Sequence, residues 1–197
     1  MISESINAFL ASTAVVTLAE IGDKTMLLAI LLAARFRAPW QVLAGIFAAT
    51  VANHLLAALL GSEVAGVLDA PWFRAAVALG FIAMAAWTLV PDKLDDDEAG
   101  SVKSRGGAFL TTLIAFFLVE IGDKTQIATI ALAAHYHSVA IIAAGTTLGM
   151  MIADGPAVFF GEALVRYISL KVARAVAALM FLVLGLWQLA SLAGWIG

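Results

Sequence analysis

The residues best suited to chemistry in this chain form an acidic hexapeptide that occurs twice. The copies are Glu20-Ile21-Gly22-Asp23-Lys24-Thr25 and Glu120-Ile121-Gly122-Asp123-Lys124-Thr125, and they lie 100 residues apart. Carboxylate and hydroxyl oxygens are hard ligands, which suit Mg²⁺, Ca²⁺ or Mn²⁺ better than Cu⁺ or Zn²⁺. Because the chain has no cysteine, thiolate metal sites and thiol catalysis are excluded. The doubled motif therefore predicts a site for a hard divalent cation, with Glu20, Asp23, Glu120 and Asp123 as its ligands.

The chain around these acids is that of a membrane protein. Hydrophobic residues make up 63% of it and charged residues only 13%, against about 45–50% and about 25% in soluble domains. The apolar residues fall into runs of roughly 20, long enough to cross about 30 Å of hydrocarbon as helices. We therefore predict an all-α polytopic membrane protein with six transmembrane helices. They run approximately over 6–34, 40–60, 72–90, 108–134, 139–164 and 172–195.

The two halves of the chain repeat each other. A shift of 100 residues aligns the hexapeptides without a gap, and it also aligns Gly45 with Gly145 and Trp87 with Trp187. We predict three helices in residues 1–90, an acidic linker over 91–107 and three helices in 108–197. Three is an odd number, so the second half must enter the membrane in the opposite sense, as in many transporters with inverted repeats.

The basic residues outside the predicted spans indicate the orientation. Eight of them fall on one side of the six-span arrangement, namely Arg35, Arg37, Lys93, Lys103, Arg105, Arg166, Lys171 and Arg174, and only Arg74 falls on the other. Loops rich in Lys and Arg stay in the cytoplasm. We therefore expect the acidic linker to be cytoplasmic and both termini to lie outside.

The position of the motif acids near mid-span calls for a function. A carboxylate there costs roughly 2.5–3.5 kcal/mol on insertion scales. On a continuous helix, Glu20, Asp23 and Lys24 would share one face, as would their counterparts. An inverted repeat would bring the two sets together near the membrane midplane. Because crowded carboxylates bind protons more readily, protons and metal would compete for the same oxygens. This competition is the physical basis of cation/proton antiport.

A structural role is the alternative for part of the motif. Glu20 and Lys24 have the i, i+4 spacing of an ion pair within one helix, as do Glu120 and Lys124. Such pairs would neutralise charge inside a bundle. They would leave Asp23 and Asp123 unmatched, which makes a purely structural reading weaker for the acids than for the lysines.

Further polar residues could assist binding or proton coupling. Gly22 and Gly122 can let the helix open and expose backbone carbonyls. Thr25 and Thr125 can supply a hydroxyl oxygen or satisfy the backbone groups freed in this way. The repeat places His54 and Asp154 at equivalent positions, with Asn53 beside the histidine, and Gln126 stands where the first half has Met26. We interpret Asp154 as a proton carrier or an indirect ligand, and Lys24, Lys124, Asn53, His54 and Gln126 as secondary candidates.

The paired Glu-x-Gly-Asp-Lys-Thr motifs, one in each three-span half, resemble those of a known family. It comprises the Golgi calcium and manganese transporters of eukaryotes and the manganese exporters of bacteria. The resemblance covers nearly the whole chain, and both copies match the family pattern. It implies export of Mn²⁺, with Ca²⁺ as the alternative, in exchange for protons, and it implies that the motif acids bind the ion. The short chain looks like a bacterial member, which implies the inner (plasma) membrane.

Other classes of function fit the sequence less well. A non-transporting membrane scaffold with structural ion pairs is the main alternative. An enzyme is not expected, because neither a zinc-binding helix motif nor a nucleophile with a paired base is visible. We expect the lipid bilayer and the transported ions as partners, with no cofactor and no nucleic acid. The oligomeric state stays open, a homo-oligomer included.

Overall fold

The computed structural model describes residues 2–65, 71–90, 107–161 and 170–195, and every element of secondary structure within them is an α-helix. The first half contains α1 (Ile2–Glu20), α2 (Lys24–Phe36), α3 (Pro39–Ala65) and α4 (Pro71–Thr88). The second contains α6 (Ala108–Glu120), α7 (Lys124–Tyr136), α8 (Val139–Phe160) and α10 (Leu170–Leu192). The prediction of an all-α fold is confirmed. Most of the predicted acidic linker, residues 91–106, lies outside the described residues.

The prediction of one continuous helix through each motif is wrong. The first predicted span consists of α1 and α2, and the fourth consists of α6 and α7. Gly22 has φ +84° and Gly122 has φ +79°. A right-handed helix cannot pass through such a residue, and glycine adopts this conformation without a steric penalty. Each motif therefore ends one helix at its glutamate and starts the next at its lysine.

The lengths of the helices bear on the number of membrane crossings. Among the described residues, three segments are long and apolar enough to cross a membrane, namely Pro39–Glu63, Val139–Phe160 and Arg174–Leu192. Arg74–Thr88 and Ala108–Glu120 are apolar but shorter. Six crossings therefore remain a prediction, which requires the broken pairs α1–α2 and α6–α7 each to cross as a unit.

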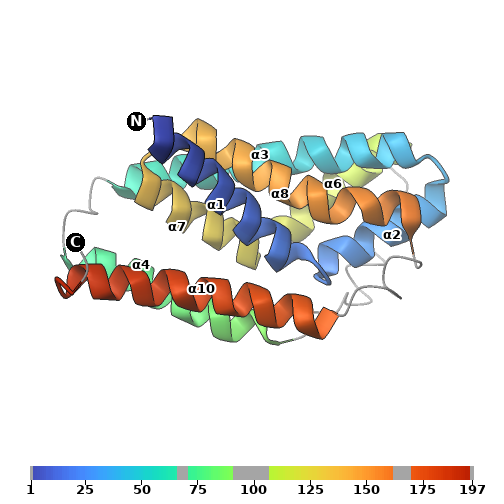
Figure 1. The fold of residues 1–197 in the computed structure, drawn as a ribbon. Helices are drawn as coiled ribbons and strands as arrows, with labels where there is room; N and C mark the ends of the chain where they lie inside the picture. Colours follow the sequence, from blue (N-terminus) through green and yellow to red (C-terminus); the bar gives the residue numbers. More distant parts are fainter. Residues whose placement is uncertain (1, 66–70, 91–106, 162–169, 196–197) are drawn as a thin grey trace.

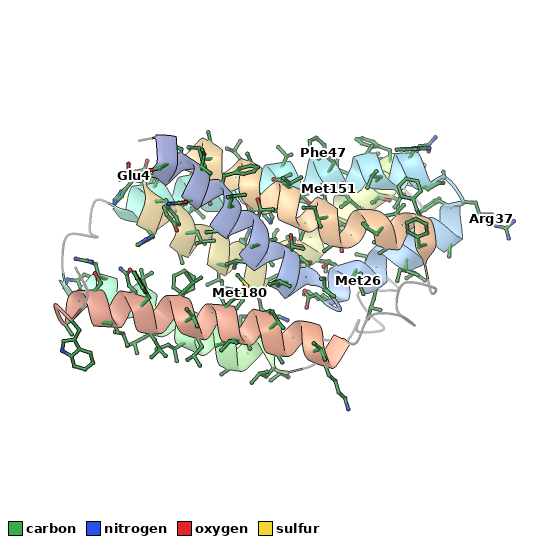
Figure 2. All side chains as sticks on the ribbon, in the orientation of Figure 1. Glu4, Met26, Arg37, Phe47, Met151 and Met180 are labelled. Carbon is green, nitrogen blue, oxygen red and sulfur yellow. The ribbon has the colours of Figure 1, made fainter. Side chains whose placement is uncertain are left out.

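The equivalent helices of the two halves run in opposite directions. In Figure 1, α1 and α2 lead away from the end where both termini lie, while α6 and α7 lead back toward it. Likewise α3 and α8 run antiparallel, as do α4 and α10. Figure 2 shows Glu4 at the end with the termini and Arg37 at the opposite end.

The two halves interlock instead of packing as separate units. The α8 helix packs against α1 and α2, and α3 packs against α6 and α7. A Cβ atom on Gly45 would lie 2.7 Å from the carbonyl oxygen of Phe109, and one on Gly145 would lie 2.8 Å from that of Phe9. Both contacts are too close for any residue larger than glycine without displacement of the backbone. The middle helix of each half is thus seated on the first helices of the other.

Two pairs of repeat-equivalent residues touch each other directly. The hydroxyl of Thr50 on α3 donates a hydrogen bond to Sδ of Met150 on α8 at 2.9 Å. The rings of Phe81 on α4 and Phe181 on α10 stack with centroids 6.3 Å apart. Equivalent residues of a two-fold arrangement meet only near its axis. A local pseudo-two-fold axis therefore passes between α3 and α8, and another passes between α4 and α10.

Candidate metal centre

The broken helices bring four helix ends together inside the protein. The α1 and α6 helices end at Glu20 and Glu120, and Asp23 and Asp123 are the N-cap residues of α2 and α7. The carboxyl end of a helix favours a cation and the amino end favours an anion. The ends of α1 and α6 therefore suit a bound cation, while those of α2 and α7 stabilise the aspartates.

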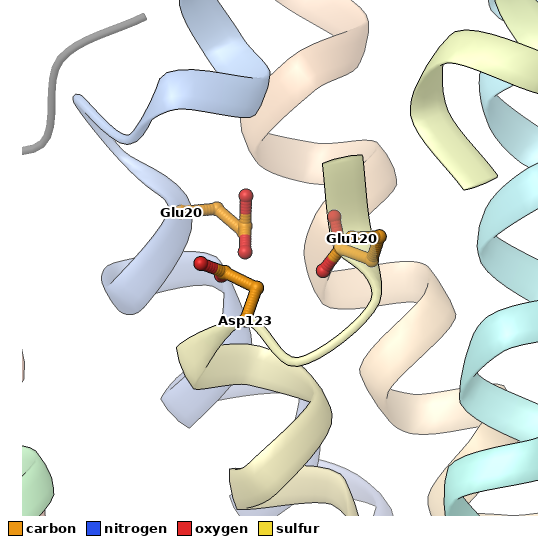
Figure 3. Close-up of side chains that lie close together, drawn as sticks. All are labelled: Glu20, Glu120 and Asp123. Atoms are coloured by element: carbon orange, nitrogen blue, oxygen red, sulfur yellow. The ribbon is translucent and has the colours of Figure 1, made fainter. Parts of the chain in front are cut away.

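Three motif carboxylates converge in this interior. Glu20, Glu120 and Asp123 each offer an oxygen, and these oxygens lie within 4.8 Å of one another (Figure 3). All three side chains are buried. Two oxygens bound to one Ca²⁺ at about 2.3–2.6 Å each can be up to about 5 Å apart. The spacing of the three oxygens therefore fits a single divalent ion.

The motif threonines orient the two glutamates. Thr25 donates a hydrogen bond to Oε2 of Glu20, and Thr125 donates one to Oε1 of Glu120, both at 2.5 Å. The other oxygen of each glutamate, Oε1 of Glu20 and Oε2 of Glu120, is buried without a hydrogen-bond partner among the described residues. Such buried carboxylate oxygens are costly unless they receive a proton or a cation. Each threonine thus fixes one oxygen and leaves the second available to a ligand.

The motif lysines pair across the repeat, not along one helix. Nζ of Lys124 lies 2.9 Å from Oδ1 of Asp23, and Nζ of Lys24 lies 3.9 Å from Oδ1 of Asp123. The i, i+4 alternative required glutamate and lysine on one helix, and that premise is wrong because the helix stops between them. The aspartates, which that alternative left unmatched, are the partners of the lysines. The two ion pairs tie the first motif to the second.

Asp154 adds a fifth carboxylate to this region. It lies fully buried on α8, and neither of its oxygens has a hydrogen-bond partner among the described residues. Its charge interacts with those of Glu20 and Glu120. A buried acid in such surroundings must hold a proton or share a cation.

The repeat-equivalent residue, His54 on α3, is also fully buried, and neither ring nitrogen has a hydrogen-bond partner among the described residues. Its neighbour Asn53 donates a hydrogen bond from Nδ2 to the carbonyl oxygen of Phe117, at 3.1 Å. Asn53 therefore holds α3 against the last turn of α6, close in sequence to Glu120.

Three polar residues have structural contacts instead of facing the carboxylates. Oε1 of Gln126 accepts a hydrogen bond from the backbone N–H of Gly122 at 2.6 Å, so the amide oxygen proposed as a ligand stabilises the break between α6 and α7. The hydroxyls of Thr13 and Thr17 donate hydrogen bonds to the carbonyl oxygens of Gly145 and Gly149, at 3.0 Å and 3.2 Å. They join α1 to α8.

The cross-repeat contacts are what the sequence analysis missed. Neither the lysine–aspartate pairs nor the bond between Thr50 and Met150 was anticipated. The 100-residue register was the available signal. In a two-fold arrangement, a residue near the axis contacts its repeat equivalent. A contact between two different residues of the two halves occurs a second time, between their repeat equivalents.

The complete arrangement is a buried set of carboxylate oxygens with an excess of negative charge. Five carboxylates and two ammonium groups leave a net charge of −3 when all are ionised. Ion sites in transporters with inverted repeats lie where discontinuous helices meet at the repeat interface. An all-helical, strongly apolar chain with such a site defines a membrane transporter of divalent cations.

Comparison with known proteins places the chain within this class. The profile of the family "Divalent cation/proton antiporter GDT1" matches residues 8–96 and 108–194. The chain belongs to this family. The two matched segments include both motifs and leave out residues 97–107, which are most of the predicted linker.

Individual relatives agree with this assignment. A Vibrio cholerae protein named "Putative manganese exporter" is 47% identical over 176 residues, which is 89% of this chain and 86% of that protein. "GDT1-like protein 4" of Oryza sativa subsp. indica is 31% identical, over 89% of this chain and 70% of that protein. "GDT1-like protein 5" of Arabidopsis thaliana is 28% identical, over 93% and 96%. No solved structure matches the chain.

Proposed function

We propose that this protein exports Mn²⁺ from the cytoplasm in exchange for protons. The observation that supports this most directly is the convergence of Glu20, Glu120 and Asp123 within 4.8 Å at the meeting point of two broken helices. The name of the Vibrio cholerae relative favours manganese as the ion. Glu20 and Glu120 bind the ion with the oxygens that their threonines leave available, and Asp123 completes the set.

The charge of the site supplies the coupling to protons. Bound Mn²⁺ would reduce the net charge of −3 to −1, and one proton on Asp154 would bring it to zero. When the metal leaves, protons on the glutamates replace its charge, since an ionised carboxylate without a counter-ion is unfavourable in this interior. Metal and protons therefore occupy the same oxygens in alternation. Lys24 and Lys124 neutralise the aspartates and hold the two motifs together.

We further propose that the chain crosses the plasma membrane six times, with both termini outside. The end of the molecule that carries Arg37 then faces the cytoplasm (Figure 2). The positive-inside rule supports this orientation. Arg35 lies in the last turn of α2, Arg37 follows that helix, and Lys171 and Arg174 lie near the start of α10 at the same end.

Flux measurements in proteoliposomes test the proposed function. Purified protein is reconstituted with a pH-sensitive dye inside, and Mn²⁺, Ca²⁺ or Mg²⁺ is added outside at constant membrane potential. We expect Mn²⁺ to drive proton movement opposite to its own, and Glu20→Gln to reduce that flux at least tenfold. Glu63→Gln is the matched control, because Glu63 is exposed at the end of α3, away from the motifs. Equal flux from wild type and Glu20→Gln would refute the role of the site.

The same experiment separates the alternatives. Oxygen ligands alone accept Ca²⁺ as readily as Mn²⁺, so Ca²⁺/H⁺ exchange is the second candidate and predicts a larger flux with Ca²⁺. A scaffold with structural ion pairs predicts no flux with any ion. It also predicts that no divalent cation raises the unfolding temperature of the purified protein.

A further inference from the structure

Within the described residues, the apolar core contains two clusters that share seven pairs of repeat-equivalent residues. The first, called here the α2–α6 cluster, includes Leu28, Leu32, Val42, Ala108, Ala115, Val119 and Val158. The second, the α1–α7 cluster, includes the equivalent residues Ala128, Leu132, Ile142, Ala8, Val15, Ala19 and Ala58. The helices α1, α2, α3, α6, α7 and α8 thus form a central bundle whose two ends are chemically alike.

The remaining two helices break this symmetry. Phe81, Met84 and Ala85 of α4 and Phe181 of α10 belong to the α1–α7 cluster. No described residue of α4 or α10 belongs to the buried α2–α6 cluster or packs against it. The α4–α10 pair is therefore docked on one of two equivalent ends.

Repeat-equivalent residues on α2 and α7 differ in exposure, because α4 covers α7 and not α2. The α4 helix lies beside α7, where Ala76, Val77, Ala131 and Ala134 line a cavity of about 240 Å³. Ala134 is buried there, with 1% of its surface exposed. On α2 the equivalent Ala34 is exposed, and Leu31, the equivalent of Ala131, is 41% exposed. Among the described helices, neither α4 nor α10 packs on the face of α2 that corresponds to the α4-covered face of α7.

The two motifs differ in cover in the same way. The α10 helix contacts α1, which ends in the first motif. Gly22 is buried and Ile21 is half-buried. At the second motif Gly122 is exposed and Ile121 is 55% exposed. The site is therefore covered beside its first motif and less covered beside its second.

The helices α4 and α10 form a tightly packed pair. Phe81 stacks on Phe181, and a Cβ atom on Gly185 would lie 2.8 Å from the carbonyl oxygen of Ala78 and 2.7 Å from Cγ1 of Ile82. Contacts this close leave little freedom for one helix to slide on the other. The contact of the pair with the central bundle includes the cavity between α4 and α7.

We propose that the α4–α10 pair is the gate of the transporter and docks alternately on the two ends of the central bundle. The structure holds it on the α1–α7 end. In the second state the repeat-equivalent contacts form: α10 lies on α2 and covers Leu31 and Ala34, while α4 moves toward α6 and covers the second motif. This inference rests on the proposed transport function, because alternate access requires two such states.

Paired cysteines can hold the gate in either state. The chain has no cysteine of its own, so each pair reacts alone. Ala76→Cys with Ala131→Cys joins α4 to α7 in the observed state, since both residues line one cavity. The repeat-equivalent pair, Val176→Cys with Leu31→Cys, joins α10 to α2 in the second state. Both of these side chains are 41% exposed, so their replacement leaves the core intact.

The experiment treats each double variant in proteoliposomes with a short bifunctional methanethiosulfonate reagent, in the presence and absence of Mn²⁺ at acidic and neutral pH. Cross-linked peptides are identified by mass spectrometry, and Mn²⁺ flux is measured before and after reduction. We expect both pairs to cross-link, each with at least a tenfold loss of flux that reduction restores. The four single-cysteine variants, treated identically, should keep their flux.

Two results would overturn the gate. One is a complete lack of the 31–176 product in every condition, confirmed with Ala34→Cys in place of Leu31→Cys. The other is undiminished flux when the 76–131 pair is fully cross-linked. The cross-linking yield is independent of which ion is transported. A wild-type protein without Mn²⁺ flux but with both products would therefore refute the proposed function and leave the two docking positions standing.

Discussion

The two cross-motif ion pairs differ in length and burial, and this difference predicts unequal consequences when each lysine is removed. Nζ of Lys124 lies 2.9 Å from Asp23, with side chains 3% and 1% exposed. Nζ of Lys24 lies 3.9 Å from Asp123, with side chains 19% and 4% exposed. At an effective dielectric constant of about 20, Coulomb's law gives roughly 6 kcal/mol for the first pair and roughly 4 kcal/mol for the second.

These values overstate the net effect, because both groups are also desolvated. Removing one partner of a buried pair typically costs about 3–5 kcal/mol, and a more exposed pair contributes less. We therefore expect Lys124→Met to lower the free energy of unfolding by about 3–5 kcal/mol and Lys24→Met by about 1–2 kcal/mol. For a chain of this size, 1 kcal/mol shifts the unfolding temperature by about 2–4 °C. The expected decreases are roughly 10 °C and a few degrees.

Thermal unfolding of the detergent-purified protein, followed by tryptophan fluorescence without metal at pH 7, measures both changes. Lys171→Met is the matched control, because Lys171 is an exposed lysine at the start of α10. The double variant Lys124→Met/Asp23→Asn should regain part of the loss, since it removes the buried carboxylate together with its ammonium. Equal decreases for the two motif lysines, or a larger one for Lys24→Met, would refute this reasoning about their environments.

Three further predictions concern packing and metal binding. Gly145→Ala should lower stability by about 1–3 kcal/mol, because its Cβ would lie 2.8 Å from the carbonyl oxygen of Phe9. Gly155→Ala on the same helix should be tolerated, since the nearest atom to its Cβ lies at 3.8 Å; similar unfolding temperatures for the two variants would contradict the packing argument. Mn²⁺ at about 100 times its Kd should stabilise the protein by about 2.7 kcal/mol, and chelation should reverse this stabilisation. The stabilisation should weaken as the pH falls, because protons compete for the same oxygens, and Glu120→Gln should abolish it. Thr125→Val should weaken Mn²⁺ binding about tenfold in titration calorimetry, because Glu120 loses the hydroxyl that orients it; unchanged affinity would remove Thr125 from the site.

The meeting of the two motifs could be predicted because the repeat is plain in the sequence. A gapless shift of 100 residues superposes the motifs, and an inverted repeat then requires them to meet. Glu20, Glu120 and Asp123 do converge. The local geometry was less accessible, because apolar periodicity continues across the motif and conceals the break. Only Gly22 and Gly122 marked it, and a glycine within a helix is common in membrane proteins.

The pairing of the lysines shows a different limit of sequence reasoning. Spacing along the chain suggests partners within one helix, whereas Lys124 reaches an aspartate 101 residues away. Which end of the bundle holds α4 and α10 was also beyond prediction. The two ends share seven pairs of repeat-equivalent core residues, and the repeat itself does not favour either end.

The seating of each middle helix on the opposite half has a consequence for the synthesis of the chain. Gly45 leaves room for the carbonyl oxygen of Phe109, which is translated more than 60 residues later. The first half therefore leaves the ribosome with α3 lacking the surface that it must cover, and its own motif lacks the charges that balance it. Folding can be completed only after α6 and α7 have inserted. A nascent chain arrested between the halves should accordingly be a substrate for membrane quality control, even though its segment Pro39–Glu63 is already long and apolar enough to cross the bilayer.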